Sequence, residues 1–114
     1  GEQPKFSAVR NGHAVLVKFS PADESAASQR WRDLLVCEGL ALQTLADAGV
    51  SAAHSRIELA GGRVFLESRR FDRTAPGGRV GMVSLEVYDR QYICAGVNWV
   101  DTAHRSGVAG PERL

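Results

Sequence analysis

The chain has 114 residues, a formal net charge of +1, and 44% hydrophobic and 24% charged residues. This length fits one small domain with one modest core, and so small a net charge does not indicate that this segment binds nucleic acid directly. Its apolar runs are too short to cross a membrane, and its Gly-Glu-Gln-Pro start is unlike a signal peptide, so we expect no contact with a membrane.

Two antiparallel strands are the first predicted elements. Asn11-Gly12 is a strong hairpin signal between a strand that ends near Arg10 and a second strand at residues 13–20. Alternation along the second strand makes both faces apolar except for one ammonium, with Val15, Val17 and Phe19 on one face and Ala14, Leu16 and Lys18 on the other. The Lys18 side chain must therefore either reach solvent, where it would protect an edge strand from pairing with another chain, or contact an anion.

A long amphipathic helix is predicted next, from about residue 27 to residue 48, between a polar loop at residues 21–27 and Gly49. An apolar stripe is formed by residues at helical spacing, namely Trp31, Leu34, Leu35, Leu42 and Leu45. Glu38 falls inside this stripe, away from a polar side that carries Arg32, Gln43 and Asp47. Because an unpaired carboxylate in an apolar stripe is costly, we predict that Glu38 pairs with Lys18.

A second hairpin is predicted from strands at residues 54–59 and 63–70, joined by a turn at residues 60–62. Together these elements predict an α+β fold, in which a mostly antiparallel sheet of four or five strands carries one long helix. The remaining chain predicts a flexible loop at residues 74–79 and a short strand at residues 80–85. Residues 86–92 predict either a helix capped by Ser84 or a further loop. Trp99, Val100 and Ala103 lie at helical spacing.

The charged segment at residues 69–73 has two interpretations. It is either a solvated basic patch, or a place where Phe71 and neighbouring backbone groups lie against a planar base. In both cases Asp72 is expected to hold Arg70 or Arg73. Cys37 and Cys94 lack the spacing of a C-x-x-C motif or a metal site, and the histidines are scattered, so we expect reduced thiols, no zinc site and a cytoplasmic protein.

Four of these segments, GEQPKF, VLVKFS, CEGLALQTLADAGV and RRFDR, resemble the HipA-like serine/threonine kinase family in order and spacing. The resemblance covers most of residues 1–85 and implies an ATP-binding N-lobe, with residues 86–114 as a short helical or irregular segment that leads toward a second lobe. It implies that Lys18, bridged to Glu38, grips the ATP phosphates, as the strand lysine of protein kinases does. The family's phosphate loop matches Gly1, Glu2, Gln3, Pro4 and Lys5.

The same resemblance makes Arg69, Arg70 and Phe71 the hinge that holds adenine. The family more often has an acidic residue where Arg69 stands, so the implied role of Arg69 is a backbone role. ATP and Mg²⁺ are the implied cofactors, a protein serine or threonine is the implied substrate, and a DNA-binding antitoxin is the implied partner.

The residues that perform phosphoryl transfer are absent from the sequence. No H-x-D-x-x-x-x-N or D-F-G motif occurs, so we expect the 114 residues to be an inactive piece of a longer kinase, with no catalytic residue and no Mg²⁺ ligand in it. The alternative is a non-catalytic module that keeps the lobe fold and binds a protein partner. A third hypothesis is a small α+β domain that binds no ligand.

Overall fold

The computed structural model describes residues 3–74, 77–94 and 98–106. It divides into two compact units, residues 1–80 and residues 81–114, which are described separately. The predictions for Gly1, Glu2 and the segment after residue 106 concern residues outside the described ranges. No described helix is both long enough and apolar enough to span a bilayer.

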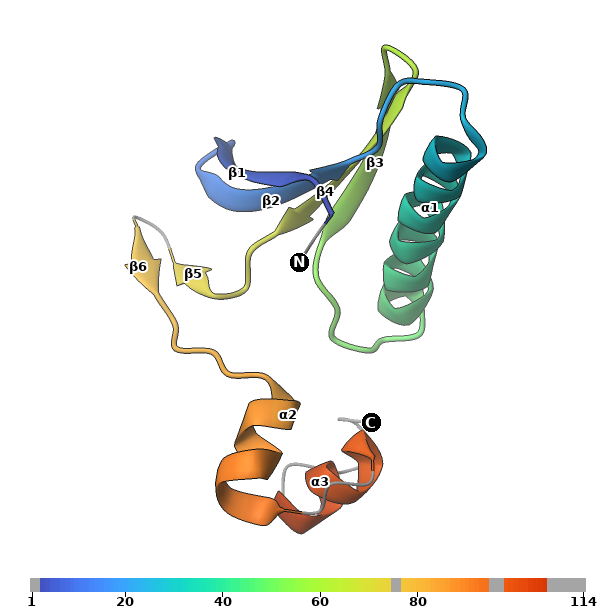
Figure 1. Cartoon of the computed structure of the whole chain (residues 1–114). Helices are drawn as coiled ribbons and strands as arrows, with labels where there is room; N and C mark the ends of the chain where they lie inside the picture. The colour runs from blue at the N-terminus through green and yellow to red at the C-terminus, as the bar shows by residue number, and fades with distance from the viewer. Residues whose placement is uncertain (1–2, 75–76, 95–97, 107–114) are drawn as a thin grey trace. The chain divides into compact units, whose positions relative to one another are not determined.

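A four-stranded antiparallel sheet forms the first unit (Figure 1). Its strands are β1 (Lys5–Arg10), β2 (His13–Phe19), β3 (Ser55–Ala60) and β4 (Arg63–Arg69), in the spatial order β1-β2-β4-β3. Asn11 and Gly12 turn the first hairpin with φ of 51° and 80°, the left-handed region that Asn and Gly tolerate best. Gly61 and Gly62 do the same in the second hairpin. The predicted fold class and both hairpins are confirmed.

The helix α1 (Ala26–Asp47) packs along one face of this sheet (Figure 1). Ser25 caps its first turn, because the Ser25 hydroxyl accepts a hydrogen bond from the Ser28 amide at 3.2 Å. Leu35 of α1 joins Val64 and Leu66 of β4 in the core, where the side chains are 1%, 4% and 0% exposed.

The predicted orientation of α1 is wrong by part of a turn. Leu34 and Leu45 of the apolar stripe are 53% and 43% exposed, and the buried positions besides Leu35 are the small residues Ser28 and Gly39. A Cβ on Gly39 would lie 2.6 Å from Cδ1 of Ile57, so a small residue here allows the helix to approach β3 closely. Glu38 consequently lies beside the buried strip instead of within it.

Arg32 also departs from its predicted place on the solvated side of α1. It is half-buried, and its Nη1 donates to the carbonyl oxygens of Pro21 at 3.0 Å and Asp23 at 3.1 Å. The guanidinium therefore ties the loop before α1 to the helix. The hydrophobicity pattern could not predict these hydrogen bonds, because the partners of Arg32 are backbone carbonyl groups, which every residue has.

The segment after β4 differs from the predicted loop and strand. Two-residue strands β5 (Arg73–Thr74) and β6 (Gly78–Arg79) pair antiparallel, and residues 80–84 form no strand. The predicted strand at residues 80–85 is thus wrong, and its apolar side chains Val80, Met82 and Val83 are more than half exposed.

The second unit contains α2 (Leu85–Tyr88), the π-helical turn η1 (Asp89–Ile93) and α3 (Trp99–Ser106). The Ser84 hydroxyl accepts from the Val87 amide at 3.2 Å, which confirms the helix opened by Ser84. Within this unit the Thr102 hydroxyl donates to the Asp89 carboxylate at 2.8 Å, and both residues are buried. This bond ties α3 to η1.

Candidate functional site

The predicted pairing of Lys18 with Glu38 is confirmed. Lys18 Nζ donates to Glu38 Oε1 at 2.8 Å, which joins β2 to α1. Lys18 stands opposite Leu66 in the β2–β4 register, so it lies on the sheet face that α1 covers. The side chains are 23% and 39% exposed, and the pair is therefore open to a ligand. An ion pair this accessible contributes at most about 1 kcal/mol to stability.

Lys5 stands directly opposite Lys18 in the β1–β2 register. Side chains at such positions share a face with Cβ atoms about 5 Å apart, and like charges there repel each other. These are the only two lysines in a chain that has 14 basic residues. Lys5 makes no ion pair with any residue that the structure describes. Glu38 thus neutralises the Lys18 ammonium alone, and the positive charge that remains on Lys5 favours an anion.

The other described residues of the predicted phosphate loop lie near this pair of lysines. The Pro4 carbonyl accepts from the Phe19 amide at 3.3 Å, which holds the loop beside the end of β2. Gln3 is half-buried and Pro4 is exposed. Pro4 and Lys5 are therefore placed at the same end of the hairpin as Lys18.

An apolar floor runs along the same face from Lys18 toward the segment after β4. Leu16 and Ala14 follow Lys18 at every second position of β2, a spacing of about 6.6 Å per step. The Arg70 amide donates to the Ala14 carbonyl at 2.9 Å, and Arg70 Nη1 donates to the Ser7 hydroxyl at 3.3 Å. The face thus connects the ammonium pair to the predicted hinge. Ser7 was not among the predicted site residues, although its pairing with Leu16 follows from the hairpin register.

Asp72 fixes the predicted hinge. Its carboxylate accepts from Arg70 Nε at 3.0 Å and Nη2 at 2.8 Å, and from Arg73 Nη1 at 2.8 Å. The hydrogen bonds from Arg70, followed by the charges of Arg70 and Arg73, lower the pKa of Asp72 from 3.8 to about 2, and the bonds to Asp72 raise the pKa of Arg70. The predicted structural role of Asp72 is confirmed.

The acid titration of Asp72 tests this clamp. Because the folded pKa of Asp72 is lowered, its contribution to stability is present above about pH 4 and is lost as the pH falls toward 2. We expect Arg70→Gln to raise the pKa of Asp72 toward its usual value, measured by carboxyl ¹³C NMR titration, and Arg73→Gln to raise it less. An Arg73→Gln effect equal to or larger than that of Arg70→Gln would contradict the assignment.

The remaining hinge residues point in different directions. Arg69 stands opposite Val15, so its side chain lies on the sheet face away from Lys18, and only its backbone faces the hinge. Phe71 is 73% exposed, and its amide donates to no acceptor among the residues described. That these two residues and Arg70 bind adenine stays a prediction.

Comparison with known proteins gives one informative match. Over 111 residues the chain is 41% identical to Toxin YjjJ of Escherichia coli strain K12, in an alignment that covers 92% of this chain. The chain is a homologue of part of that toxin. It spans about a quarter, 25%, of the toxin's length. No family model matches the chain, and no solved structure matches it.

Proposed function

We propose that this chain is the ATP-binding lobe of a HipA-like serine/threonine kinase, and that the whole protein is a toxin that transfers the γ-phosphate of ATP to a protein serine or threonine. Two sequence similarities support the proposal. The sequence segments resemble the HipA-like family, and the chain is similar to a quarter of a protein named as a toxin. The 114 residues alone are expected to be inactive.

The observation that carries the proposal is the arrangement of Lys5, Lys18 and Glu38. Glu38 orients the Lys18 ammonium, and the two opposed lysines leave one positive charge without a carboxylate. Lysine is a compact point charge that suits phosphate oxygens. In this role Glu38 positions Lys18, while Lys5 and Lys18 bind the triphosphate. ATP supplies the phosphoryl group, and these residues hold it in place.

The adenine end is assigned to the segment that Asp72 fixes. The hinge follows β4 directly, and the Phe71 amide, which donates to no acceptor among the described residues, could donate to a ring nitrogen. Leu16 and Ala14 offer an apolar floor between the two ends. This arrangement suits a ligand with an anionic tail and a planar base.

The other parts of the reaction are assigned to the rest of the protein. Because the H-x-D-x-x-x-x-N and D-F-G motifs do not occur in this sequence, we propose that the Mg²⁺ ligands belong to the rest of the protein. By the family resemblance, the phosphate acceptor is a protein and a DNA-binding antitoxin is the partner.

The affinity of the full-length protein for ATP tests the role of Lys5. We expect Lys5→Gln to weaken ATP binding about tenfold or more in isothermal titration calorimetry, because a charged hydrogen bond contributes about 1.5–3 kcal/mol. Arg30→Gln removes the same charge from an exposed position of α1 and serves as the control. If both variants bind ATP alike, Lys5 has no specific role. If the wild-type protein binds no nucleotide, the alternative of a protein-binding module is favoured.

A further inference from the structure

A second basic hollow lies on the sheet face that points away from α1. It has a volume of about 160 Å³. The cationic and imidazole side chains that line it come from all four strands of the sheet: Arg10 from β1, His13 from β2, Arg69 from β4, Arg56 from β3, and His54 directly before β3. The register agrees, because Arg10 pairs with His13 and Arg69 with Val15, both on the face away from Lys18.

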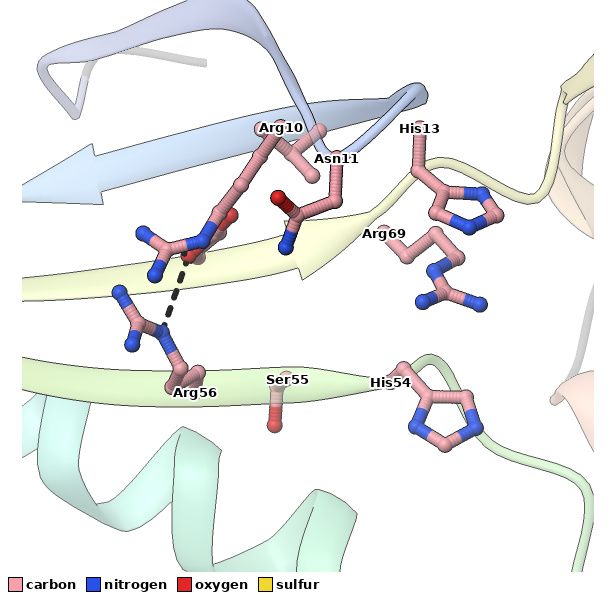
Figure 2. Close-up of a pocket in the computed structure, with 9 residues that line it drawn as sticks. Arg10, Asn11, His13, His54, Ser55, Arg56 and Arg69 are labelled. Carbon is pink, nitrogen blue, oxygen red and sulfur yellow. Dashed lines mark hydrogen bonds and ion pairs between the residues drawn. The ribbon is translucent and has the colours of Figure 1, made fainter. Parts of the chain in front are cut away.

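Figure 2 shows how these side chains are arranged. The Arg69 guanidinium lies between the imidazoles of His13 and His54, while the guanidiniums of Arg10 and Arg56 approach each other from opposite strands. The Asn11 amide is directed into the space between the two groups. The Ser55 side chain, by contrast, is directed away from them.

One carboxylate organises the two opposed arginines. Glu67 Oε2 lies 3.2 Å from Arg56 Nε and 3.5 Å from Arg10 Nη1, and the Glu67 side chain is only 15% exposed. Arg69 makes no ion pair with any residue that the structure describes. Three arginines and one glutamate line the hollow. Because Arg56 also pairs with Glu58 at 3.1 Å, the three arginines face two carboxylates, and one positive charge, that of Arg69, is left in surplus.

We propose that this hollow binds the phosphate group of a phosphate monoester. Guanidinium groups match the geometry of phosphate oxygens and bind them in a bidentate manner, and the Asn11 amide and the two imidazoles provide further donors. The hollow has space for several waters at about 30 Å³ each, which suits one tetrahedral group. The site lies on the opposite face from Lys18 and does not rest on the proposed kinase function.

A single phosphate fits the surface better than a nucleic acid does. A nucleic acid is bound by basic side chains that follow its backbone over several phosphates. Farther along the same face the side chains are Phe6, Phe65 and Glu58, which line a neighbouring hollow with Arg56 and Glu67. The next cation along this face is Arg63, which lies over the Phe19 ring at the other end. The basic side chains therefore form no continuous track, as expected for a site that binds a compact anion.

The test is a titration of the full-length protein with O-phospho-L-serine and with inorganic phosphate at fixed ionic strength, observed through the arginine Nε–H signals in NMR spectra. We expect saturable binding that Arg69→Gln and Arg56→Gln each weaken about tenfold. The matched control Arg30→Gln, exposed on α1, should change it less than about twofold. Tighter binding of phosphoserine would indicate a phosphorylated side chain as the source, and equal binding would indicate free phosphate.

Three results would overturn the proposal. An equal loss of binding in Arg69→Gln and Arg30→Gln would show that only net charge matters. Loss of binding in Lys18→Met would place the phosphate at the other face of the sheet. A short DNA duplex or RNA strand that binds more tightly than phosphoserine, and that is weakened by the same Arg69→Gln and Arg56→Gln changes, would identify a nucleic-acid surface instead of a monoester site.

Discussion

Lys18→Ala is expected to lower phosphoryl transfer by the full-length protein about 100-fold or more, the size of effect that follows removal of a group that stabilises charge on a reacting phosphate. The ammonium stands on the α1 face of β2, 2.8 Å from Glu38, with Lys5 directly opposite. The substitution removes the positive charge that we propose binds the ATP phosphates. Activity is measured as transfer of radiolabelled γ-phosphate to protein.

The fold should survive this change, which separates a binding role from a structural one. The Lys18–Glu38 pair is partly open to solvent, so its loss should alter the free energy of unfolding by no more than about 1 kcal/mol. A protein that stays folded and keeps full transfer activity after Lys18→Ala would remove Lys18 from the mechanism.

The partner residue gives a matched comparison. Glu38→Gln should also reduce ATP affinity, because it releases the Lys18 ammonium from its oriented position. Glu58→Gln is the control, since Glu58 is also in an ion pair, with Arg56 at 3.1 Å, but on a different strand. If Glu38→Gln leaves ATP affinity unchanged, the pair is a packing contact without a role in binding.

Leu66→Ala is expected to cause the largest loss of stability, about 2–5 kcal/mol. The Leu66 side chain is 0% exposed and belongs to the core cluster between β4 and α1. Its removal leaves a cavity beneath Gly39 of α1, whose added Cβ would already contact Leu66 Cδ1 at 3.4 Å. Because a small domain has a limited total stability, much of the protein should unfold at moderate urea concentration.

Leu59→Ala is the matched control for this prediction. Leu59 lies on β3 of the same sheet but is 72% exposed, so its truncation should change the unfolding free energy by less than about 0.5 kcal/mol. Urea denaturation monitored by circular dichroism measures both. Similar midpoints for Leu66→Ala and Leu59→Ala would show that the core does not lie between α1 and β4.

The sequence was sufficient to predict the elements whose signals are local. Asn11-Gly12 predicted the first turn because few residues adopt positive φ there. The turn at residues 60–62 likewise predicted the second hairpin. The Lys18–Glu38 pair was also predictable, since both charges stood at positions where an apolar side chain was expected.

The errors came from contacts that hydrophobicity does not encode. The small residue Gly39 lets α1 approach the sheet closely, and Leu34 and Leu45 remain exposed. Arg32 is half-buried because backbone carbonyls receive it. The hollow at Arg69 and Arg56 joins residues from separate strands, and only the register of the assembled sheet brings them together.

A structure of the full-length protein with a non-hydrolysable ATP analogue tests the central claim most directly. The account predicts phosphate oxygens within hydrogen-bonding distance of the Lys18 and Lys5 ammonium groups, with the adenine ring against the backbone of Arg70 and Phe71. An analogue bound on another surface, or a saturated crystal in which the Lys18 face holds no nucleotide, would contradict it.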